Sequence, residues 1–452
     1  MVEAADTIET ALDISCSSSE NLILDDFRRL TGPGFLWSHV GANLDVLCPT
    51  ADLDEVIKVW QQQARRVLDA IGWHSEQIID RRFEGGANLA VSAPMDQLYS
   101  AMLACQTAWH FASAQLLNQT ANNFDIMIND LRNIMVREAN PALITLITAA
   151  KKHGVDVLCD DDHLSLGHGE GSQTWSVFDL PKPTEVNWHS LHDIPVALIT
   201  GTNGKTTSTR LCSAIGAAAG LIAGITSTEF VRVGDDILDY GDYSGPGGAR
   251  MLLRDKRLQV AFLEVARGGI LRRGLPLRQA QAALVTNVAA DHLGQYGVNT
   301  VEELAVAKFS VHRTLAANGV LVLNADDEYV RAEVTRTQAI LCWFSLNPAH
   351  PLITQAKTKG HTCAWQEGDH LVYFDGTKAY PVVNVKDIPI SMGGAADYNI
   401  RNALGALCLA KVMNIDNKAI ALGLCNFKND AKDNPGRCNE FAIKGARVFV
   451  DF

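Results

Sequence analysis

Residues 196–207, Val-Ala-Leu-Ile-Thr-Gly-Thr-Asn-Gly-Lys-Thr-Thr, decide the fold of this chain, because an apolar strand there runs directly into a glycine-rich loop. Gly201 and Gly204 allow the backbone N–H groups of the loop to turn towards phosphate oxygens. Lys205 would bridge the outer phosphates, and the hydroxyl of Thr206 would reach a Mg²⁺ ion. The stretch therefore predicts a nucleoside triphosphate site.

The loop departs from the strict phosphate-loop pattern at one position. That pattern has a glycine five positions before Gly204, where this chain has Ile199. The alternative is an ordinary strand–turn–helix that carries a surface lysine. The two glycines of the loop and the helix expected over 206–218 favour the phosphate site.

The composition is that of an ordinary soluble globular protein, with 47% apolar and 20% charged residues. A chain of 452 residues is too long for one compact core and predicts more than one domain. The net charge of −12, without any long basic run, argues against a nucleic-acid surface.

The cysteines and the N-terminus bear on the compartment. Ten cysteines occur without a Cys-x-x-Cys pair, which predicts a reduced, cytoplasmic setting rather than a disulfide framework or zinc ribbon. The acidic N-terminus lacks the basic and apolar segments of a signal peptide. No apolar run approaches the roughly 20 residues that a bilayer span needs, so no membrane association is expected.

Periodicity indicates an α/β architecture in the second half of the chain. Apolar strands are expected at 196–200, 259–265, 282–287 and 319–323, each followed by a stretch compatible with a helix. Such alternation predicts parallel βαβ units, which hold ligands at the carboxyl ends of their strands. The first half instead mixes helices, expected over 54–72 and 97–119, with short strands.

The chain is expected to divide into five parts. They are a flexible tail at 1–25, an α+β N-terminal domain at 26–176, a proline-containing linker at 177–194, a central ATP-binding domain at 195–430, and a hinge with the first strand of a truncated C-terminal domain at 431–452. A domain that stops directly after a strand predicts either a fragment or dependence on another chain.

Three polar side chains follow strand ends near the loop. Glu264 closes the strand at 259–265, where its carboxylate would reach a metal beside Thr206. Asn287 and His292 lie just beyond the strand at 282–287 and would serve a second metal or the substrate. Singly, Glu264 would be a salt-bridged strand-end residue and His292 a polar loop residue. Together with the phosphate loop, they favour a functional site.

Several motifs resemble those of the Mur ligase family. They are Gly201-Thr-Asn-Gly-Lys-Thr-Thr207, the segment 287–292, Lys308 and Pro435-Gly436-Arg437. Within that family, three segments are similar to the Mur-ligase-like half of cyanophycin synthetases. They are Gly-Asp-Tyr-Ser-Gly-Pro at 241–246, Glu-Val-Ala-Arg-Gly-Gly-Ile-Leu-Arg-Arg-Gly at 264–274, and Ser-Met-Gly-Gly-Ala-Ala-Asp-Tyr-Asn-Ile-Arg-Asn at 391–402.

This resemblance covers about residues 195–452 and implies a P-loop-type, mostly parallel sheet flanked by helices. A weaker resemblance to the N-terminal domain of cyanophycin synthetases is carried by Arg28-Arg-Leu-Thr-Gly-Pro33, Trp37 and Leu164-Ser-Leu-Gly-His-Gly169. In those enzymes an ATP-grasp domain follows, whereas here only the segment 177–194 intervenes. The chain is therefore expected to lack that domain, which puts full cyanophycin synthesis in doubt.

The resemblance implies an ATP-dependent amide ligase that activates a carboxylate as an acyl phosphate for attack by an amine, with Mg²⁺. The implied ATP contacts are Gly201, Thr202, Asn203, Gly204, Lys205, Thr206, Thr207, Asn399, Asn402, Arg437 and Asp451. The implied metal ligands are Thr206, Glu264 and His292, and the implied catalytic residues are Lys205, His292 and Lys308. Many family members carry a carbamylated lysine at the place of Lys308; the alternative is a solvated helical lysine.

The implied substrates are amino acids or peptides. Arginine grips carboxylates bidentately, so the candidates for the carboxylate substrate are Ser244, Arg267, Arg272 and Arg273. Surface charges on a glycine-rich loop are the alternative for each. Two other functions remain open: an ATP-binding regulatory paralogue without catalysis, and a ligase resembling folylpolyglutamate synthase. Analogy also leaves a homo-oligomer open.

Overall fold

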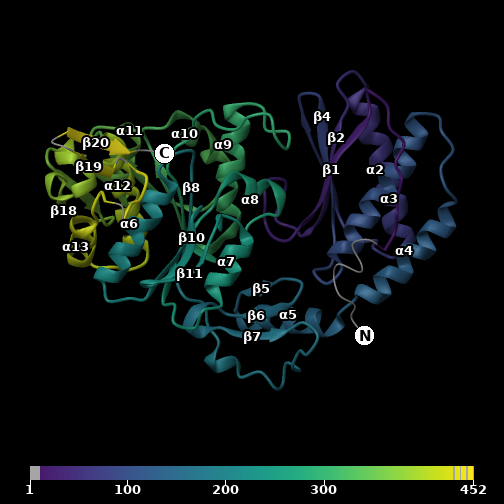
Figure 1. Cartoon of the computed structure of the whole chain (residues 1–452), viewed down its shortest axis with the longest axis horizontal. Coiled ribbons are helices and arrows are strands. Elements are labelled where there is room, and N and C mark those ends of the chain that lie inside the picture. The colour runs from purple at the N-terminus through teal and green to yellow at the C-terminus, as the bar shows by residue number, and fades with distance from the viewer. Residues whose placement is uncertain (1–10, 431–432, 438, 444–445, 451–452) are drawn as a thin grey trace.

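The computed structural model groups most of the chain around three sheets (Figure 1). The described residues are 11–430, 433–437, 439–443 and 446–450. A four-stranded sheet with its helices forms one end of the molecule, and an eleven-stranded sheet forms the other. A three-stranded sheet lies between them, at the lower edge of the view.

The N-terminal sheet is antiparallel, with strand order β1-β2-β4-β3. Its strands are β1 (Ile23–Leu30), β2 (Gly41–Leu47), β3 (Ile78–Phe83) and β4 (Gly86–Ser92). Helices α2 (Leu53–Ala70) and α3 (Leu98–Leu116) pack against this sheet, and α4 (Phe124–Glu138) packs against α3. Trp60 and Trp109 are fully buried in the shared core. The expected α+β character of this region is confirmed.

A smaller unit follows, with α5 packed beside a three-stranded antiparallel sheet. Its elements are α5 (Pro141–His153), β5 (Val157–Cys159), β6 (His163–Leu166) and β7 (Gln173–Ser176). Helix α5 begins where the Asn140 side chain accepts a hydrogen bond from the N–H of Leu143, and it ends at Gly154, whose φ is 69°. Leu146 and Leu164 form part of a separate small core.

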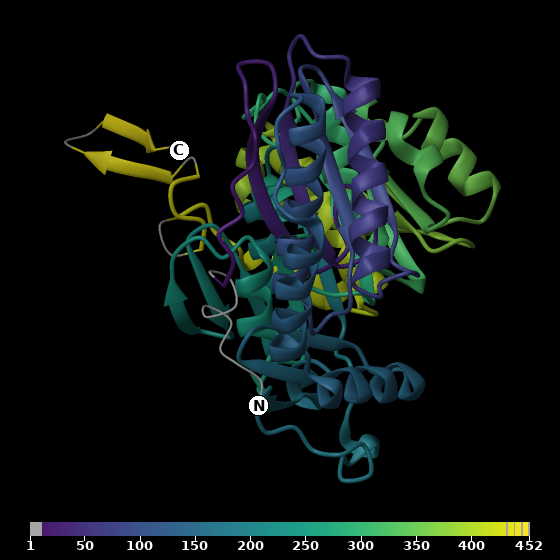
Figure 2. The same ribbon diagram turned by 90° about the vertical axis from the view of Figure 1, so that its right-hand side faces the viewer.

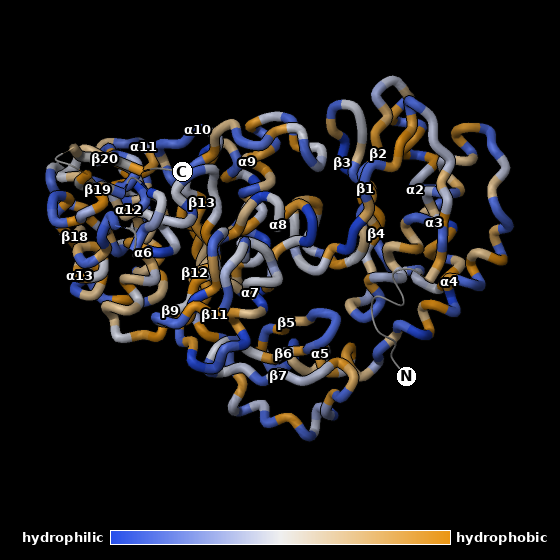
Figure 3. The backbone as a smooth tube through the Cα atoms, in the orientation of Figure 1, coloured by the Kyte–Doolittle hydropathy of each residue, from blue (hydrophilic) through white to orange (hydrophobic). Residues whose placement is uncertain are grey.

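The eleven-stranded sheet has the order β11-β10-β9-β12-β8-β13-β14-β15-β16-β17-β18. Its strands are β8 (Val196–Thr200), β9 (Ala223–Thr226), β10 (Phe230–Val233), β11 (Asp236–Tyr240), β12 (Val260–Glu264), β13 (Ala280–Val285), β14 (Leu315–Asn324), β15 (Ile340–Ser345), β16 (Cys363–Glu367), β17 (His370–Phe374) and β18 (Ala379–Asn384). All neighbours from β9 to β16 are parallel, and both edges are antiparallel. Figure 3 shows hydrophobic residues along the central strands, as expected for parallel strands covered on both faces.

Helices cover both faces of this sheet. One face packs against α6 (Lys205–Ala218), α12 (Asp397–Val412) and α13 (Asn417–Asn426). The other packs against α7 (Pro246–Leu253), α8 (Arg267–Arg272), α9 (Val301–Phe309), α10 (Glu328–Ala332) and α11 (Pro351–Thr358). The predicted mostly parallel sheet flanked by helices is confirmed. No helix within the described residues combines the length and apolar character of a membrane span.

The division into five parts stays a prediction, to which the structure adds three facts. Strand β1 begins at Ile23, inside the segment expected to be a tail. The linker 177–194 has no strand or α-helix, but Val186 and Leu191 are buried in the small core beside α5. After the hinge the chain forms a hairpin of β19 (Asn439–Ile443) and β20 (Ala446–Val450), so the expectation of a single strand there is wrong. Figure 2 shows this hairpin projecting from the body.

Candidate active site

The loop between β8 and α6 has the backbone that its glycines predict. Gly201 and Gly204 have φ values of 148° and 81°, in the region that side chains disfavour. A Cβ on Gly204 would lie 2.2 Å from Oδ1 of Asn402, and one on Gly201 would lie 1.9 Å from Oγ1 of Thr286. Both positions therefore require glycine for space as well as for conformation.

Residues after the neighbouring strand β13 hold this loop in place. The N–H of Thr202 donates to the carbonyl of Asn287 at 2.9 Å, and the N–H of Asn203 donates to Asn287 Oδ1 at 3.0 Å. Asn287 Nδ2 in turn donates to the carbonyl of Asn203 at 2.9 Å. The amide of Asn287 thus braces the loop, and its service to a second metal or the substrate stays a prediction.

Two lysines converge beneath the loop. Lys205 Nζ donates to the carbonyls of Gly201 at 3.0 Å and Thr202 at 2.9 Å. Lys308, from α9, is 2% exposed, and its Nζ donates to the Gly201 carbonyl at 2.8 Å. Burial lowers the pKa of Lys205. Burial, together with the neighbouring charge of Lys205, lowers the pKa of Lys308 to about 7. The alternative of a solvated helical lysine at Lys308 is therefore wrong.

Glu264 ends β12 next to the start of α6. Its side chain is 2% exposed, and among the described residues neither carboxylate oxygen has a hydrogen-bond partner of normal geometry. Burial raises its pKa, an effect that the nearby Lys205 and Thr206 partly offset. A buried carboxylate without partners is costly, so this position favours a cation. Oxygen ligands from Glu264 and Thr206 suit a hard divalent ion such as Mg²⁺.

The two asparagines of α12 lie on the other side of the loop. Asn402 Nδ2 donates to Asn399 Oδ1 at 3.2 Å, and Asn399 Nδ2 donates to the carbonyl of Ile390 at 2.8 Å. A cavity of about 380 Å³ is lined by these asparagines, Tyr398, Arg437 and residues 202–207. An adjoining cavity of about 360 Å³ reaches Asp326 and Arg401. The structure therefore brings the predicted loop residues and the two predicted asparagines of α12 to one cavity.

Arg437 reaches this cavity on a segment that is tied to α6. The buried Arg210 donates to Glu229 Oε2 at 2.7 Å and to Asn434 Oδ1 at 3.4 Å. The sequence reasoning missed Arg210, although its place one helical turn after Thr206 puts it on the same face of the helix. Asp451, one of the ATP contacts implied by the resemblance, lies outside the described residues.

The predicted substrate residues do not all lie in one cavity. Ser244 is 4% exposed and lines a narrow cavity with Glu264. Arg267 Nη2 donates to Gln295 Oε1 at 2.6 Å. Arg272 and Arg273 are exposed at the end of α8. The structure does not bring these two side chains into the cavity beside the loop.

His292 also stays apart from the other predicted metal ligands. Its side chain is 72% exposed, its φ is 47°, and its ring lies 3.6 Å from Asp291. The predicted ligand set of Thr206, Glu264 and His292 is therefore only partly assembled, with Thr206 and Glu264 adjacent and His292 facing solvent.

Comparisons with known proteins agree with this geometry. Residues 199–410 match the family model of the Mur ligase middle domain. Cyanophycin synthetase from Trichormus variabilis is 38% identical over 277 residues, which cover 61% of this chain and 30% of that protein. UDP-N-acetylmuramoylalanine–D-glutamate ligase from Streptococcus gordonii is 27% identical over 252 residues, covering 55% of this chain and 47% of that one.

Among solved structures, E. coli FolC in complex with DHPP and ADP aligns with a TM-score of 0.41 and 18% identity. The alignment covers 57% of this chain and 61% of that one. The matches to the two curated relatives cover less than half of the length of either.

Proposed function

We propose that this chain binds ATP and joins a carboxylate to an amine, because residues 199–410 match the family model of the Mur ligase middle domain. The observation that carries the proposal is the gathering of Lys205, Glu264, Asn402 and Arg437 around Gly204. Backbone N–H groups at the start of α6 would receive the phosphates, and Lys205 would stabilise charge on the transferred phosphoryl group.

Thr206 and Glu264 would hold the metal. Mg²⁺ prefers oxygen ligands and would neutralise charge that develops on the phosphates. Among the described residues, neither Glu264 oxygen has a hydrogen-bond partner of normal geometry, which supports this assignment. Thr206 and Glu264 would orient the nucleotide, and the buried setting would exclude bulk water.

The reaction would run in two displacements. The substrate carboxylate attacks the γ-phosphorus, an acyl phosphate forms, and ADP leaves. The nitrogen of the amine then attacks the acyl carbon, inorganic phosphate leaves and an amide remains, with the amine proton released. Ser244 and Arg267 would hold the carboxylate substrate. Ser244 lines a narrow cavity with Glu264, and Arg267 donates a hydrogen bond to the carbonyl of His292.

Lys308 is the candidate for a carbamate. Its pKa of about 7 supplies the neutral amine that must attack CO₂, giving Lys–NH–COO⁻ and a proton. The product would add a carboxylate beside the phosphate loop. A ¹³C resonance seen with labelled bicarbonate in the parent protein, and missing from Lys308→Met, tests this modification. A resonance of equal size in both proteins would contradict it.

Amine-dependent phosphate release from ATP tests the function. The assay would contain Mg²⁺ and a panel of amino acids and dipeptides, with mass spectrometry of the product. We expect release that requires both a carboxylate and an amine, a new amide, and loss of both in Lys205→Met. ATP binding without turnover across the panel would refute the ligase proposal.

A second candidate is an ATP-binding regulatory protein without catalysis. The exposure of His292, Arg272 and Arg273, away from the loop, favours it. The same assay separates the two, because the regulatory protein would bind nucleotide and release no phosphate. A specificity like that of folylpolyglutamate synthase would appear as a requirement for glutamate as the amine.

A further inference from the structure

A cavity that shares no lining residue with the phosphate loop lies where three parts of the chain meet. Its volume is about 120 Å³. Its polar lining comes from β1, the start of α3, the end of α4, the β5–β6 turn and α7, with Arg29, Asp96, Tyr99, Glu138, Asp161 and Arg250 as the main groups. Figure 1 shows α7 directly above β5 at this junction.

Arg250 is the unusual group in this cavity. Its side chain is 15% exposed, and its contact with a carboxylate is 3.8 Å, from Nε to Asp160 Oδ2. Within the described part of the chain, no hydrogen bond reaches its guanidinium. Burial lowers the pKa of Arg250. An arginine has five N–H donors, so a half-buried one whose carboxylate contact among the described residues is as long as 3.8 Å favours an anionic ligand.

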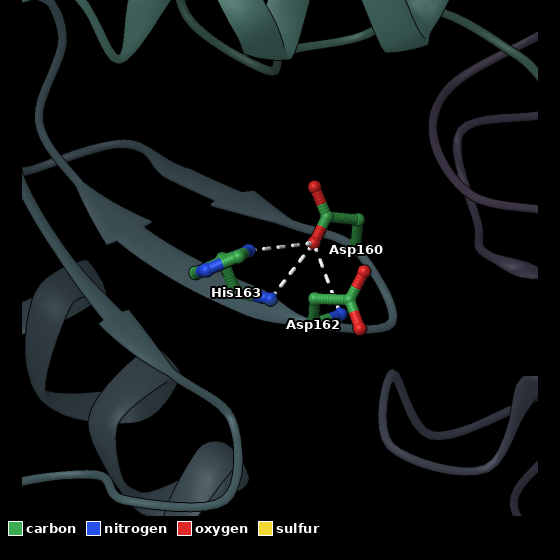
Figure 4. Close-up of side chains that lie close together, drawn as sticks. All are labelled: Asp160, Asp162 and His163. Atoms are coloured by element: carbon green, nitrogen blue, oxygen red, sulfur yellow. Dashed lines mark hydrogen bonds and ion pairs between the residues drawn. The ribbon is translucent and has the colours of Figure 1, made fainter. Parts of the chain in front are cut away.

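Asp160 is shared between Arg250 and closer donors. Oδ2 accepts from Arg254 Nη1 at 2.6 Å. Oδ1 accepts from the N–H groups of His163 at 2.8 Å and Asp162 at 3.2 Å, which Figure 4 shows within the β5–β6 turn. These bonds also account for the closeness of Asp160, Asp162 and His163. Arg250 therefore keeps only the 3.8 Å ion pair to Asp160 among the described residues.

The cavity is also lined by two acids, Asp96 and Glu138. Asp96 Oδ2 accepts from the N–H of Asn140 at 2.8 Å, and the two oxygens of Glu138 accept from the N–H groups of Tyr99 and Ser100, each at 2.8 Å. Burial raises the pKa of both acids, and the charge of Asp96 adds to the effect on Glu138. No cationic side chain of the described residues pairs with either acid.

Apolar side chains line the same cavity, among them Leu98, Leu143 and Val177. Charges of opposite sign in one partly apolar cavity suit a ligand that carries both charges on a short carbon skeleton. Arg29, the other arginine of the cavity, is already bound to both oxygens of Asp161.

We propose that this cavity binds a small zwitterion of the amino-acid class, a free amino acid or a dipeptide. Its carboxylate pairs with Arg250, and its ammonium group lies against Asp96 and Glu138. Because the ligand touches α7 and the N-terminal sheet together, its binding links the two ends of the molecule. The proposal does not depend on the ligase activity.

Isothermal titration of the full chain with the twenty L-amino acids, without nucleotide, tests the proposal. We expect saturable binding of at least one. The amide and the N-acetyl derivative of that amino acid each lack one charge and should bind about tenfold more weakly or worse. Arg250→Gln and Asp96→Asn should weaken the binding of the underivatised amino acid by a similar factor.

Two arginine variants serve as controls. Arg257, paired with Asp255 and Asp236 on the surface, lies outside the cavity, so Arg257→Gln should leave the affinity unchanged. Arg267→Gln tests whether the amino acid instead binds beside the phosphate loop. Absence of any saturable binding, or binding that Arg267→Gln abolishes and Arg250→Gln spares, would overturn the proposal. The two derivatives use the unaltered protein, so they decide the question even where Arg250→Gln fails to fold.

Discussion

Lys308 Nζ donates a 2.8 Å hydrogen bond to the carbonyl oxygen of Gly201, the same oxygen that accepts a 3.0 Å bond from Lys205. Two buried amino groups therefore share one acceptor. Burial, together with the charge of Lys205, lowers the pKa of Lys308 to about 7, so its protonation changes within the range where most enzymes work.

The shifted pKa of Lys308 predicts a dependence of stability on pH. The unfolded chain would hold this proton up to the ordinary value of 10.5, whereas the folded chain releases it at about 7. Between these values the unfolded state binds more protons, so the contribution of Lys308 to the free energy of unfolding rises with pH. Urea unfolding should therefore show the stability of Lys308→Met falling relative to the parent as pH increases above 7. The exposed Lys58→Met is the control, and parallel pH curves for Lys308→Met and the parent would contradict the prediction.

Glu264→Gln should separate metal binding from nucleotide binding. The neutral side chain loses a metal ligand but also removes a negative charge next to the phosphates. We expect Mg²⁺ to stop strengthening the binding of ADP, a loss of about 1.5–3 kcal/mol, while ADP without metal binds at least as tightly as to the parent. Titration calorimetry with and without Mg²⁺ measures both. The exposed Glu302→Gln should behave like the parent; an unchanged Mg²⁺ effect in Glu264→Gln would remove Glu264 from the site.

Gly204→Ala should disrupt the loop. The new Cβ would meet Asn402 Oδ1 at 2.2 Å, at a φ of 81° that costs a non-glycine residue about 1–2 kcal/mol. We expect a lower melting temperature and loss of nucleotide binding, measured by thermal unfolding with and without ATP. Gly247→Ala on α7 is the matched control, because a Cβ there meets nothing within 4 Å. Equal behaviour of the two variants would show that Gly204 tolerates a side chain.

Asp45→Asn should destabilise the N-terminal sheet. Asp45 is 2% exposed and accepts hydrogen bonds from Arg28, Asn43 and Asn88. Removing its charge leaves Arg28 buried without its main partner, at a cost of about 3–5 kcal/mol in the free energy of unfolding.

Asp54→Asn is the control for that substitution. Asp54 pairs with Arg82 on the surface, where both side chains are more than half exposed, and such pairs contribute about 0–1 kcal/mol. Chemical denaturation compares the two variants. A loss for Asp45→Asn no larger than that for Asp54→Asn would refute the prediction.

The central strands were predictable because they are buried on both faces. Strand β8 and strand β12 are fully buried, so both appear in the sequence as continuous apolar runs. Strand β11 has every residue exposed, and β9 has four residues, so neither gives such a run. Strand β19, Asn-Glu-Phe-Ala-Ile, has no alternation of polar and apolar residues and directly follows turn residues, so the sequence did not reveal it.

The candidate site was predictable where motif and strand end coincide. Glu264 ends a recognisable apolar strand, so its type and position indicated the site, whereas Asn402 was predicted from the family resemblance of the segment 391–402. The direction of the His292 side chain depends on a loop with positive φ, which no periodicity reveals. The bond from Arg210 to Asn434 joins residues 224 positions apart, and nothing local indicates such a partner.

The contact between Gly204 and Asn402 has a consequence for biosynthesis. The loop leaves the ribosome almost two hundred residues before the helix that completes its outer wall. At usual elongation rates this interval lasts roughly 10–40 s. During this interval the newly made loop would lack the wall from α12. It would have the contacts from Asn287 only after that residue has been synthesised. A nascent chain would therefore acquire nucleotide affinity late and abruptly, and ATP would select for chains whose synthesis has passed α12.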